Sequence, residues 1–359
     1  MKNQVAPLIK RIRWIDVAKG LAIILVVLGH AASPLAASNI SAKFILNLTY
    51  TIHMPVFFYL AGLANDSFSK KNLSIHKQIQ SKFIRLLVPY FTFSIINGCL
   101  IYGGSLIPQL KSFLYQGDFP GIISFIMEIL FQVRNKDVHL WFAYYLFVYS
   151  VISILIQSCT CDSKKTYRVL FTLVLLVSVL ILPIMPEFYL SDVISKYIFW
   201  SGYYLAGCIH LHEKIERKNI VIKAGICIGI GINTLYAMFL DDIHQYNMIY
   251  WILRIIVGYT SIAYIILISK CIDTYMNSGI VAKIEYLGRR SFVIYILHQP
   301  FITVGFVVVF SYIFQNNGQI ITIVLTTILG VLIPLLIDKS IRSNWMRMIL
   351  FGEKKTMLQ

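Results

Sequence analysis

The run FILNLTYTIHMPVFFYLAGLA, residues 44–64, is apolar over a length that can cross a lipid bilayer as one helix. Near its middle it carries His53 and Pro55, a polar side chain and a residue that bends helices. His53 is too far from both ends of the run for its ring to reach the lipid headgroups. The run therefore predicts a membrane helix that holds a polar group inside a bundle, where such groups usually mark a site or a pathway.

Similar apolar runs recur along the whole chain. Of 359 residues, 58% are hydrophobic and 13% are charged, and the mean hydropathy is +0.73. The charged share is about half that of an ordinary soluble domain. A chain this apolar cannot hide its side chains in a soluble core, so we predict an all-α, polytopic transmembrane helical bundle solvated by the lipid bilayer.

We predict about ten transmembrane helices in a single integral-membrane domain covering residues 1–359. The expected spans are 17–35, 44–64, 83–103, 140–158, 169–186, 196–210, 220–240, 249–269, 291–314 and 319–337.

Basic residues are distributed unevenly between the two ends of these spans. Of the 32 lysines and arginines, two fall inside spans, and 25 fall in segments that share the side of the N-terminus. The five on the opposite side are Lys43, Lys111, Arg134, Lys136 and Lys196. The positive-inside rule therefore predicts that both termini are cytoplasmic. The net charge of +16 reflects this topology, so we expect no nucleic-acid partner.

Cysteine usage points neither to a disulfide framework nor to a metal. Cys159 and Cys161 form a Cys-x-Cys pair, but no second pair of ligands lies near them in the sequence. We therefore expect no metal.

Five basic or histidine side chains fall inside the predicted spans: His30, His53, Arg85, Arg254 and His298. A charged side chain at the bilayer centre costs about 2.5 kcal/mol or more. Residues near a helix end can instead snorkel to the headgroups, and a single histidine can serve an interhelical hydrogen bond. Five such groups in one bundle favour a functional site.

Two clusters of charge mark the cytoplasmic ends of spans. In RWIDVAKGLAIILVVLGH, residues 13–30, Asp16 and Lys19 are one turn apart, and His30 lies about 16 Å further along the helix. In KFIRLLVPYF, residues 82–91, Lys82 and Arg85 are spaced to share one face. Two cations at a membrane mouth suit a phosphorylated cytosolic ligand. Ordinary positive-inside anchoring is the alternative, above all for Lys82.

At the outer ends of spans, VHLWFAYYLF, residues 138–147, places His139 and Trp141 at the interface, where an aromatic girdle is also expected. The preceding outer loop, 104–139, contains GIISFIMEILFQ, too short to span and suited to an interfacial helix or lid. In SFVIYILHQP, residues 291–300, the spacing puts Ser291, Tyr295 and His298 on one face.

Taken in order, these pieces resemble the acyltransferase-3 family of membrane acyltransferases, and within it the fucose 4-O-acetylase-like branch. The resemblance rests on RWIDVAKGLAIILVVLGH, HMPVFFYLAGL, KFIRLLVPY, HLWFAYYLF, YYLAG and LGRRSFVIYILHQPFI, which together extend through most of the chain. Each piece alone is weak because apolar helices mimic one another, but their order on a ten-span frame is specific.

The resemblance implies an O-acetyltransferase of the bacterial inner (plasma) membrane. Such a protein moves an acetyl group from cytosolic acetyl-CoA to a hydroxyl of a cell-surface polysaccharide or its lipid-linked precursor. The family's leading catalytic candidate corresponds to His30, and its basic pair, often Arg-x-x-Arg, corresponds to Lys82 and Arg85. Where relatives often carry serine before the glycine of the second span, this chain has Ala61.

The same chemistry follows from the residues themselves. A sugar hydroxyl needs a base while it attacks a thioester, and histidine, with an ordinary pKa near 6.5, suits that task. We expect His30 as general base or acyl-accepting residue and His53 as a second catalytic group. The remaining candidates divide by side, with the donor held by Asp16, Lys19, Lys82 and Arg85 and the acceptor by His139, Trp141, Arg254 and His298.

Three questions stay open at this point. Direct attack and a transient acyl-histidine are both compatible with these residues. Interior histidines and arginines also serve carriers, so a polysaccharide exporter or proton-coupled transporter is the rival interpretation. A purely structural membrane partner would leave the interior polar groups without a task. The acceptor sugar, the acyl group and the oligomeric state are not encoded in these patterns.

Overall fold

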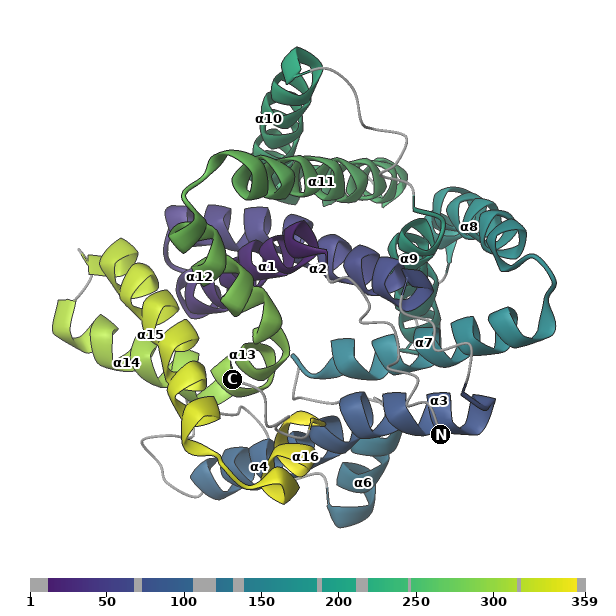
Figure 1. The fold of residues 1–359 in the computed structure, drawn as a ribbon. Coiled ribbons are helices and arrows are strands. Elements are labelled where there is room, and N and C mark those ends of the chain that lie inside the picture. Colours follow the sequence, from purple (N-terminus) through teal and green to yellow (C-terminus); the bar gives the residue numbers. More distant parts are fainter. Residues whose placement is uncertain are drawn as a thin grey trace. The chain divides into compact units, whose positions relative to one another are not determined.

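The computed structural model describes residues 12–67, 73–105, 121–131, 139–185, 189–210, 219–244, 247–314 and 318–353. Every regular element in these ranges is helical, and no strand occurs among them. The predicted fold class, a polytopic helical bundle, is therefore confirmed (Figure 1).

The α-helices are α1 (Arg13–Ala32), α2 (Ile40–Ser67), α3 (Ile75–Lys82), α4 (Val88–Ser105), α6 (Ile122–Phe131), α7 (Trp141–Cys159), α8 (Ser163–Leu180), α9 (Tyr189–Cys208), α10 (Asn219–His244), α11 (Asn247–Tyr275), α12 (Ser278–Arg289), α13 (Ser291–Leu297), α14 (Thr303–Phe314), α15 (Gln319–Ser340) and α16 (Asn344–Phe351). Short 3-10 turns lie at η1 (Ser33–Leu35) and η3 (Leu182–Ile184), and π-helical turns lie at η2 (Phe83–Leu87) and η5 (His298–Ile302).

Nine helical stretches in the described part of the chain are long and apolar enough to cross a membrane. They correspond to nine of the ten expected spans, with Ile75–Leu100 and Ser291–Phe314 each running through a π-helical turn. The expected span 196–210 coincides with α9, which is a helix but is not among the nine. Its tyrosines, serines and charged residues lower its hydropathy, although hydrophobic residues occupy most of its length.

Three short helices in the described part of the chain belong to none of the nine spans. α6 is the short helix expected in the outer loop, whose segments 106–120 and 132–138 lie outside the described residues. The amphipathic helices α12 and α16 follow spans and carry basic residues. Neither helix was predicted from the sequence, because both are too short to form an apolar run that crosses a bilayer.

The chain forms two compact units, each made of three segments. The first unit comprises Met1–Ile23, Thr51–Lys71 and Tyr167–Ser291, and the second comprises Ile24–Tyr50, Asn72–Thr166 and Phe292–Gln359. Helices α1 and α2 are each divided between the two units, α1 after Ile23 and α2 after Tyr50. The prediction of a single domain over 1–359 stays a prediction, and the units are described separately below.

The first unit is held together by aromatic packing and buried amide hydrogen bonds. Trp200 of α9 stacks on Phe58 of α2, with ring centroids 5.5 Å apart. Helices α10 and α11 pack against one another, and the fully buried Asn233 of α10 joins them through bonds to the carbonyl of Val257 (3.4 Å) and the hydroxyl of Thr260 (3.2 Å). Side-chain hydrogen bonds of this kind join helices where no water is present.

The second unit packs its helices through small residues. Ala31, Ala32, Ala42 and Ile323 form a buried cluster that joins α1, α2 and α15. Helices α14 and α15 lie side by side, α3 packs on α7, and α16 packs on α4 (Figure 1). Small side chains let helix backbones approach closely, which favours association in a bilayer.

Candidate active site

The membrane span Ser291–Phe314 is interrupted at His298. α13 ends at Leu297, η5 covers His298–Ile302, and α14 continues from Thr303. Within the break, Gln299 has an extended backbone (φ −118°, ψ 156°). The residue before a proline is disfavoured in the helical conformation, and Pro300 follows Gln299. The Gln-Pro pair therefore accounts for the break and leaves His298 at the end of a helix.

The ring of His298 is held by the end of α13. Its Nδ1 lies 3.0 Å from the carbonyl oxygen of Ile294 and 2.8 Å from that of Tyr295. A carbonyl oxygen only accepts hydrogen bonds, so Nδ1 carries the proton and donates. The last carbonyls of a helix lack intrahelical donors, which makes them available to this ring. In the neutral ring the lone pair is consequently on Nε2.

Three histidines from separate segments of the second unit meet at this point. The ring centroid of His298 lies 5.2 Å from that of His30 at the end of α1, and 5.8 Å from that of His139, just before α7. His139 and His298 are buried, with 5% and 0% of their surfaces exposed, and His30 is half-buried. We call His30, His139 and His298 the histidine cluster.

Neighbouring aromatic residues hold His139 in place. The hydroxyl of Tyr295 donates a 2.6 Å hydrogen bond to the backbone carbonyl of His139, and the two rings lie 6.1 Å apart. Tyr295 and His298 thus face the same neighbour, as expected for two residues on one face. Trp141, two residues on, opens α7 and packs edge-on against Tyr145 at 5.0 Å.

His30 has an aromatic neighbour on α2. The hydroxyl of Tyr50 lies 3.5 Å from Nδ1 of His30, and the two rings meet edge-on with centroids 5.8 Å apart. Tyr50 itself is exposed. Tyr50 was not among the residues predicted from the sequence, although it lies one turn before His53 in the same apolar run.

Of the two basic candidates of the third span, one directly precedes a π-helical turn and the other lies within it. Lys82 ends α3 and is half-buried, whereas Arg85 is exposed at the centre of η2. Isolated π turns inside α-helices are frequent at functional sites. Arg85 and the histidine cluster belong to the same unit.

Asp16 and Lys19 lie in the first unit and form an ion pair with each other. The Nζ of Lys19 is 3.8 Å from Oδ1 of Asp16, whose side chain is buried. Next to them, Gly20 packs directly against the backbone of Ile284 in α12. At this glycine, a neighbouring helix therefore occupies the space that the missing side chain leaves.

Arg254 lies in α11 among aromatic rings of the first unit. Its guanidinium carbon is 4.5 Å from the ring centroid of Phe199, 5.3 Å from Trp251, 5.5 Å from Trp200 and 5.7 Å from Tyr250. Aromatic faces attract cations, so this arrangement stabilises a half-buried charge within a span.

His53 is buried, with 2% of its surface exposed, and lies in the first unit. Pro55 follows within the same helix, because α2 continues from Ile40 to Ser67. The structure does not assign His53 to the histidine cluster of the second unit, and its catalytic role stays a prediction.

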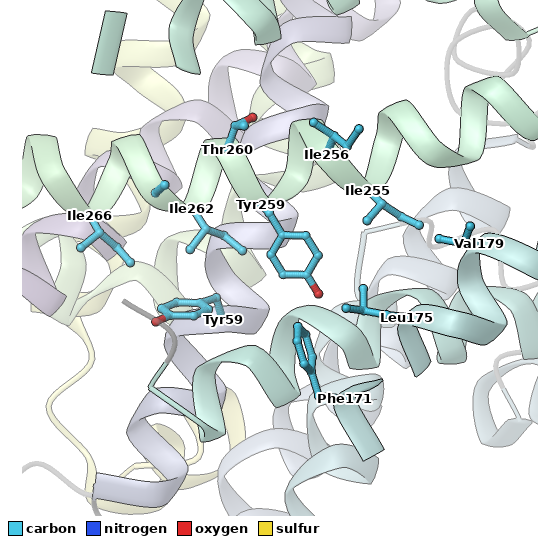
Figure 2. Close-up of a pocket in the computed structure, with 11 residues that line it drawn as sticks. Tyr59, Phe171, Leu175, Val179, Ile255, Ile256, Tyr259, Thr260, Ile262 and Ile266 are labelled. Atoms are coloured by element: carbon cyan, nitrogen blue, oxygen red, sulfur yellow. The ribbon is translucent and has the colours of Figure 1, made fainter. Parts of the chain in front are cut away.

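An apolar cavity of about 580 Å³ lies in the first unit, between α2, α8 and α11. Figure 2 shows the ring of Tyr259 from α11 at its centre, facing Phe171 of α8. The lining side chains are Tyr59, Phe171, Leu175, Val179, Ile255, Ile256, Tyr259, Thr260, Ile262, Ala263 and Ile266. This lining contains no histidine, carboxylate or basic side chain, and its ionisable groups are the phenols of Tyr59 and Tyr259.

The histidine cluster is therefore the part of the described chain best suited to proton transfer. It combines a ring with a defined lone pair, two neighbouring imidazoles and a phenol. The described residues contain no group of three or more His, Cys, Asp or Glu side chains arranged to hold a metal ion. Sequence reasoning placed His139 and His298 in acceptor binding and did not foresee their proximity to His30.

The fold and the histidine cluster place this chain in one class of membrane protein, a polytopic helical bundle with polar side chains in its interior. Comparison with known families identifies that class: residues 12–339 match the acyltransferase-3 family, described as an acyltransferase domain. The match covers most of the chain, which therefore belongs to this family of acyltransferases and is a multi-pass membrane protein. No curated protein and no solved structure matches the chain.

Proposed function

We propose that this acyltransferase moves an acetyl group from cytosolic acetyl-CoA to a hydroxyl of a cell-surface polysaccharide or its lipid-linked precursor, at the bacterial inner membrane. Family membership supports acyl transfer in general. The observation that carries the assignment of a site is the histidine cluster, in which the rings of His30 and His298 are 5.2 Å apart inside a membrane bundle.

In the proposed reaction, the acceptor hydroxyl oxygen attacks the thioester carbonyl carbon while a histidine takes the hydroxyl proton. The carbon–oxygen bond forms, the carbon–sulfur bond breaks, and the CoA thiolate leaves and receives the proton. We assign the base to His30, as the family resemblance implies. Proton transfer by a positioned side chain typically contributes about 10²–10⁴-fold to a rate.

The geometry of His298 supports a proton-handling role beside His30. Its Nδ1 is committed to the carbonyls of Ile294 and Tyr295, so Nε2 is the atom that can exchange a proton. His139, fixed by Tyr295, is the second ring in contact with His298. We propose that His298 and His139 pass the proton or hold the acceptor hydroxyl, whichever of direct attack or acyl-histidine formation operates.

The donor phosphates are assigned to the basic turn of the third span. Arg85 is exposed, and its guanidinium group carries a permanent positive charge. The N–H groups of this planar group can donate two parallel hydrogen bonds to a phosphate. Lys82 supplies a second positive charge, but its ammonium group cannot pair with phosphate through two parallel hydrogen bonds. We keep Asp16 and Lys19 as proposed donor contacts, and Trp141 and Arg254 as proposed acceptor contacts. Arg254 lies among four aromatic rings, which are surfaces of the kind that sugar rings stack on.

Mass analysis of the acceptor tests this function against the rival transporter. Cells that express the wild type or a variant lacking His30 are grown with labelled acetate, and their surface glycans are analysed by mass spectrometry. We expect acetyl-sized additions that depend on the wild-type protein and disappear in His30→Ala. A glycan that changes its location but not its mass would instead identify a carrier.

A further inference from the structure

The turn that carries Arg85 departs from regular α-helix for a reason visible in the sequence. Pro89 has no N–H, so it cannot close the usual hydrogen bond onto the carbonyl of Arg85, four residues earlier. The chain widens instead, and the N–H of Val88 donates to the carbonyl of Phe83, five residues back. The widened turn packs against α7 and α16, and these contacts help to hold it in place.

A C-terminal segment packs against this turn. We call residues 341–353 the C-terminal clasp; it contains α16, which lies against α4 and η2 (Figure 1). At the end of α16, Gly352 has φ +64°, a left-handed conformation that favours glycine. A Cβ at Gly352 would lie 2.5 Å from both Cα and the carbonyl oxygen of Arg85, and 2.6 Å from the carbonyl oxygen of Ile84. The clasp backbone therefore touches the Arg85 backbone directly.

A buried arginine fixes the clasp in this position. Arg347 of α16 has 3% of its surface exposed and forms ion pairs with Asp338 (2.9 Å) and Glu353. It also donates to the backbone carbonyls of Asp338 (3.0 Å) and Ile341 (3.4 Å). Burial lowers the pKa of Arg347, but its hydrogen bonds to Asp338 and Glu353 outweigh this and hold the pKa above its ordinary value. The end of α15 is thereby joined to the residue that follows Gly352.

We propose that the C-terminal clasp positions the Arg85 turn for the phosphates of the acyl donor, with Gly352 and Arg347 as its positioning residues. The inference rests on the proposed function, because it assumes that Arg85 binds the donor. The clasp lies beyond residue 339, where the family match ends, so family membership does not assign it this role. The Arg85 guanidinium is exposed, and no acidic side chain in the described part of the chain pairs with it.

Substitution at Gly352 with a matched control tests the clasp. Gly352→Ala introduces a methyl group against the Arg85 backbone. Gly121→Ala is the control, because Gly121 also has a positive φ (+85°) but a Cβ there meets nothing within 4 Å. Acetyl-CoA binding is measured by calorimetry on the purified full-length protein in nanodiscs. We expect Gly352→Ala to weaken binding about tenfold or more, and Gly121→Ala to leave it within about twofold.

A double-mutant cycle then distinguishes positioning of Arg85 from a general loss of structure. We expect Arg85→Ala to weaken binding, and Gly352→Ala to add nothing in the Arg85→Ala background. An undiminished effect of Gly352→Ala in that background would overturn the proposal. Where Gly352→Ala yields no folded protein, Glu353→Gln replaces it, with a severalfold loss of binding expected and unchanged binding contradicting the clasp.

The binding experiment distinguishes failure of the proposed donor from failure of the proposed role of the C-terminal clasp. A wild-type protein that does not bind acetyl-CoA removes the proposed donor, and the clasp proposal with it. A wild type that binds acetyl-CoA, together with a Gly352→Ala variant that binds equally well, overturns the clasp alone.

Discussion

At the scale of single residues, the two backbone carbonyls that contact Nδ1 of His298 determine which ring nitrogen carries the proton. A histidine with one nitrogen committed to backbone acceptors presents its other nitrogen in a single protonation state when neutral. The pair Gln299–Pro300 creates this situation by ending α13, and it is visible in the sequence. What the sequence does not show is that His30 and His139, from other segments, lie beside that ring.

Two amide substitutions separate the roles of the nitrogens of His298. The side-chain amide introduced by His298→Asn reaches the position of Nδ1, whereas the longer one introduced by His298→Gln reaches that of Nε2. We expect His298→Asn to keep the protein folded, because the contacts to Ile294 and Tyr295 persist. Its kcat for acetyl transfer should fall about 100-fold or more.

Turnover and thermal unfolding, measured together in detergent, check this expectation. His298→Gln is the counterpart, predicted to unfold at a lower temperature because the carbonyls at the end of α13 lose their donor. Wild-type turnover in His298→Asn would show that Nε2 takes no part in the reaction.

At the scale of helices, two of the spans that carry candidate groups, those with Arg85 and His298, are interrupted near a proline. Pro89 follows Arg85 by four residues, and Pro300 follows His298 by two. Each span contains a π-helical turn at that place, η2 and η5 respectively. Pro55 in α2 and Pro334 in α15 lie inside continuous α-helices, so a proline alone does not predict such a turn. The neighbours that the widened turns acquire come from distant segments and are not predictable either.

The buried ion pair of the clasp predicts a large effect on stability. Arg347→Ala leaves the buried carboxylate of Asp338 without the cation that it contacts at 2.9 Å. Removing one partner of a buried pair typically costs about 3–5 kcal/mol. We expect a clear fall in the unfolding temperature of the purified protein, followed by circular dichroism in detergent.

Glu353→Gln is the matched comparison, because the Glu353 side chain is 41% exposed. Pairs in contact with solvent contribute at most about 1 kcal/mol, so this variant should unfold close to the wild type. Equal destabilisation by both substitutions would contradict the assignment of Asp338 as the principal partner of Arg347.

At the scale of the whole molecule, apolar length decides most of the fold. Nine of the ten expected spans coincide with helices that can cross a membrane, because a run of about 20 apolar residues has few other stable forms in lipid. α9 falls outside this set because its tyrosines and polar residues lower its hydropathy. Two of these tyrosines, Tyr203 and Tyr204, are buried in the packing of the unit. α12 and α16 escaped prediction because short amphipathic helices leave no comparable signal.

The uneven distribution of basic residues predicts the orientation of the chain. With both termini cytoplasmic, green fluorescent protein fused to the C-terminus should fluoresce, and alkaline phosphatase fused at the same place should be inactive. Moving the fusion to a point after Lys43 should reverse both results. Active phosphatase at the C-terminus would invert the topology and, with it, the assignment of Arg85 to the cytoplasmic side.

The central claim, that the histidine cluster transfers an acyl group from acetyl-CoA, is tested most directly by following radiolabelled acetyl-CoA with the purified protein in nanodiscs. Thioester loss and acyl label on the protein are measured for the wild type and for His30→Ala. The account predicts consumption or labelling by the wild type that is absent in His30→Ala, while both proteins unfold at similar temperatures. Undiminished consumption of acetyl-CoA by His30→Ala would contradict it.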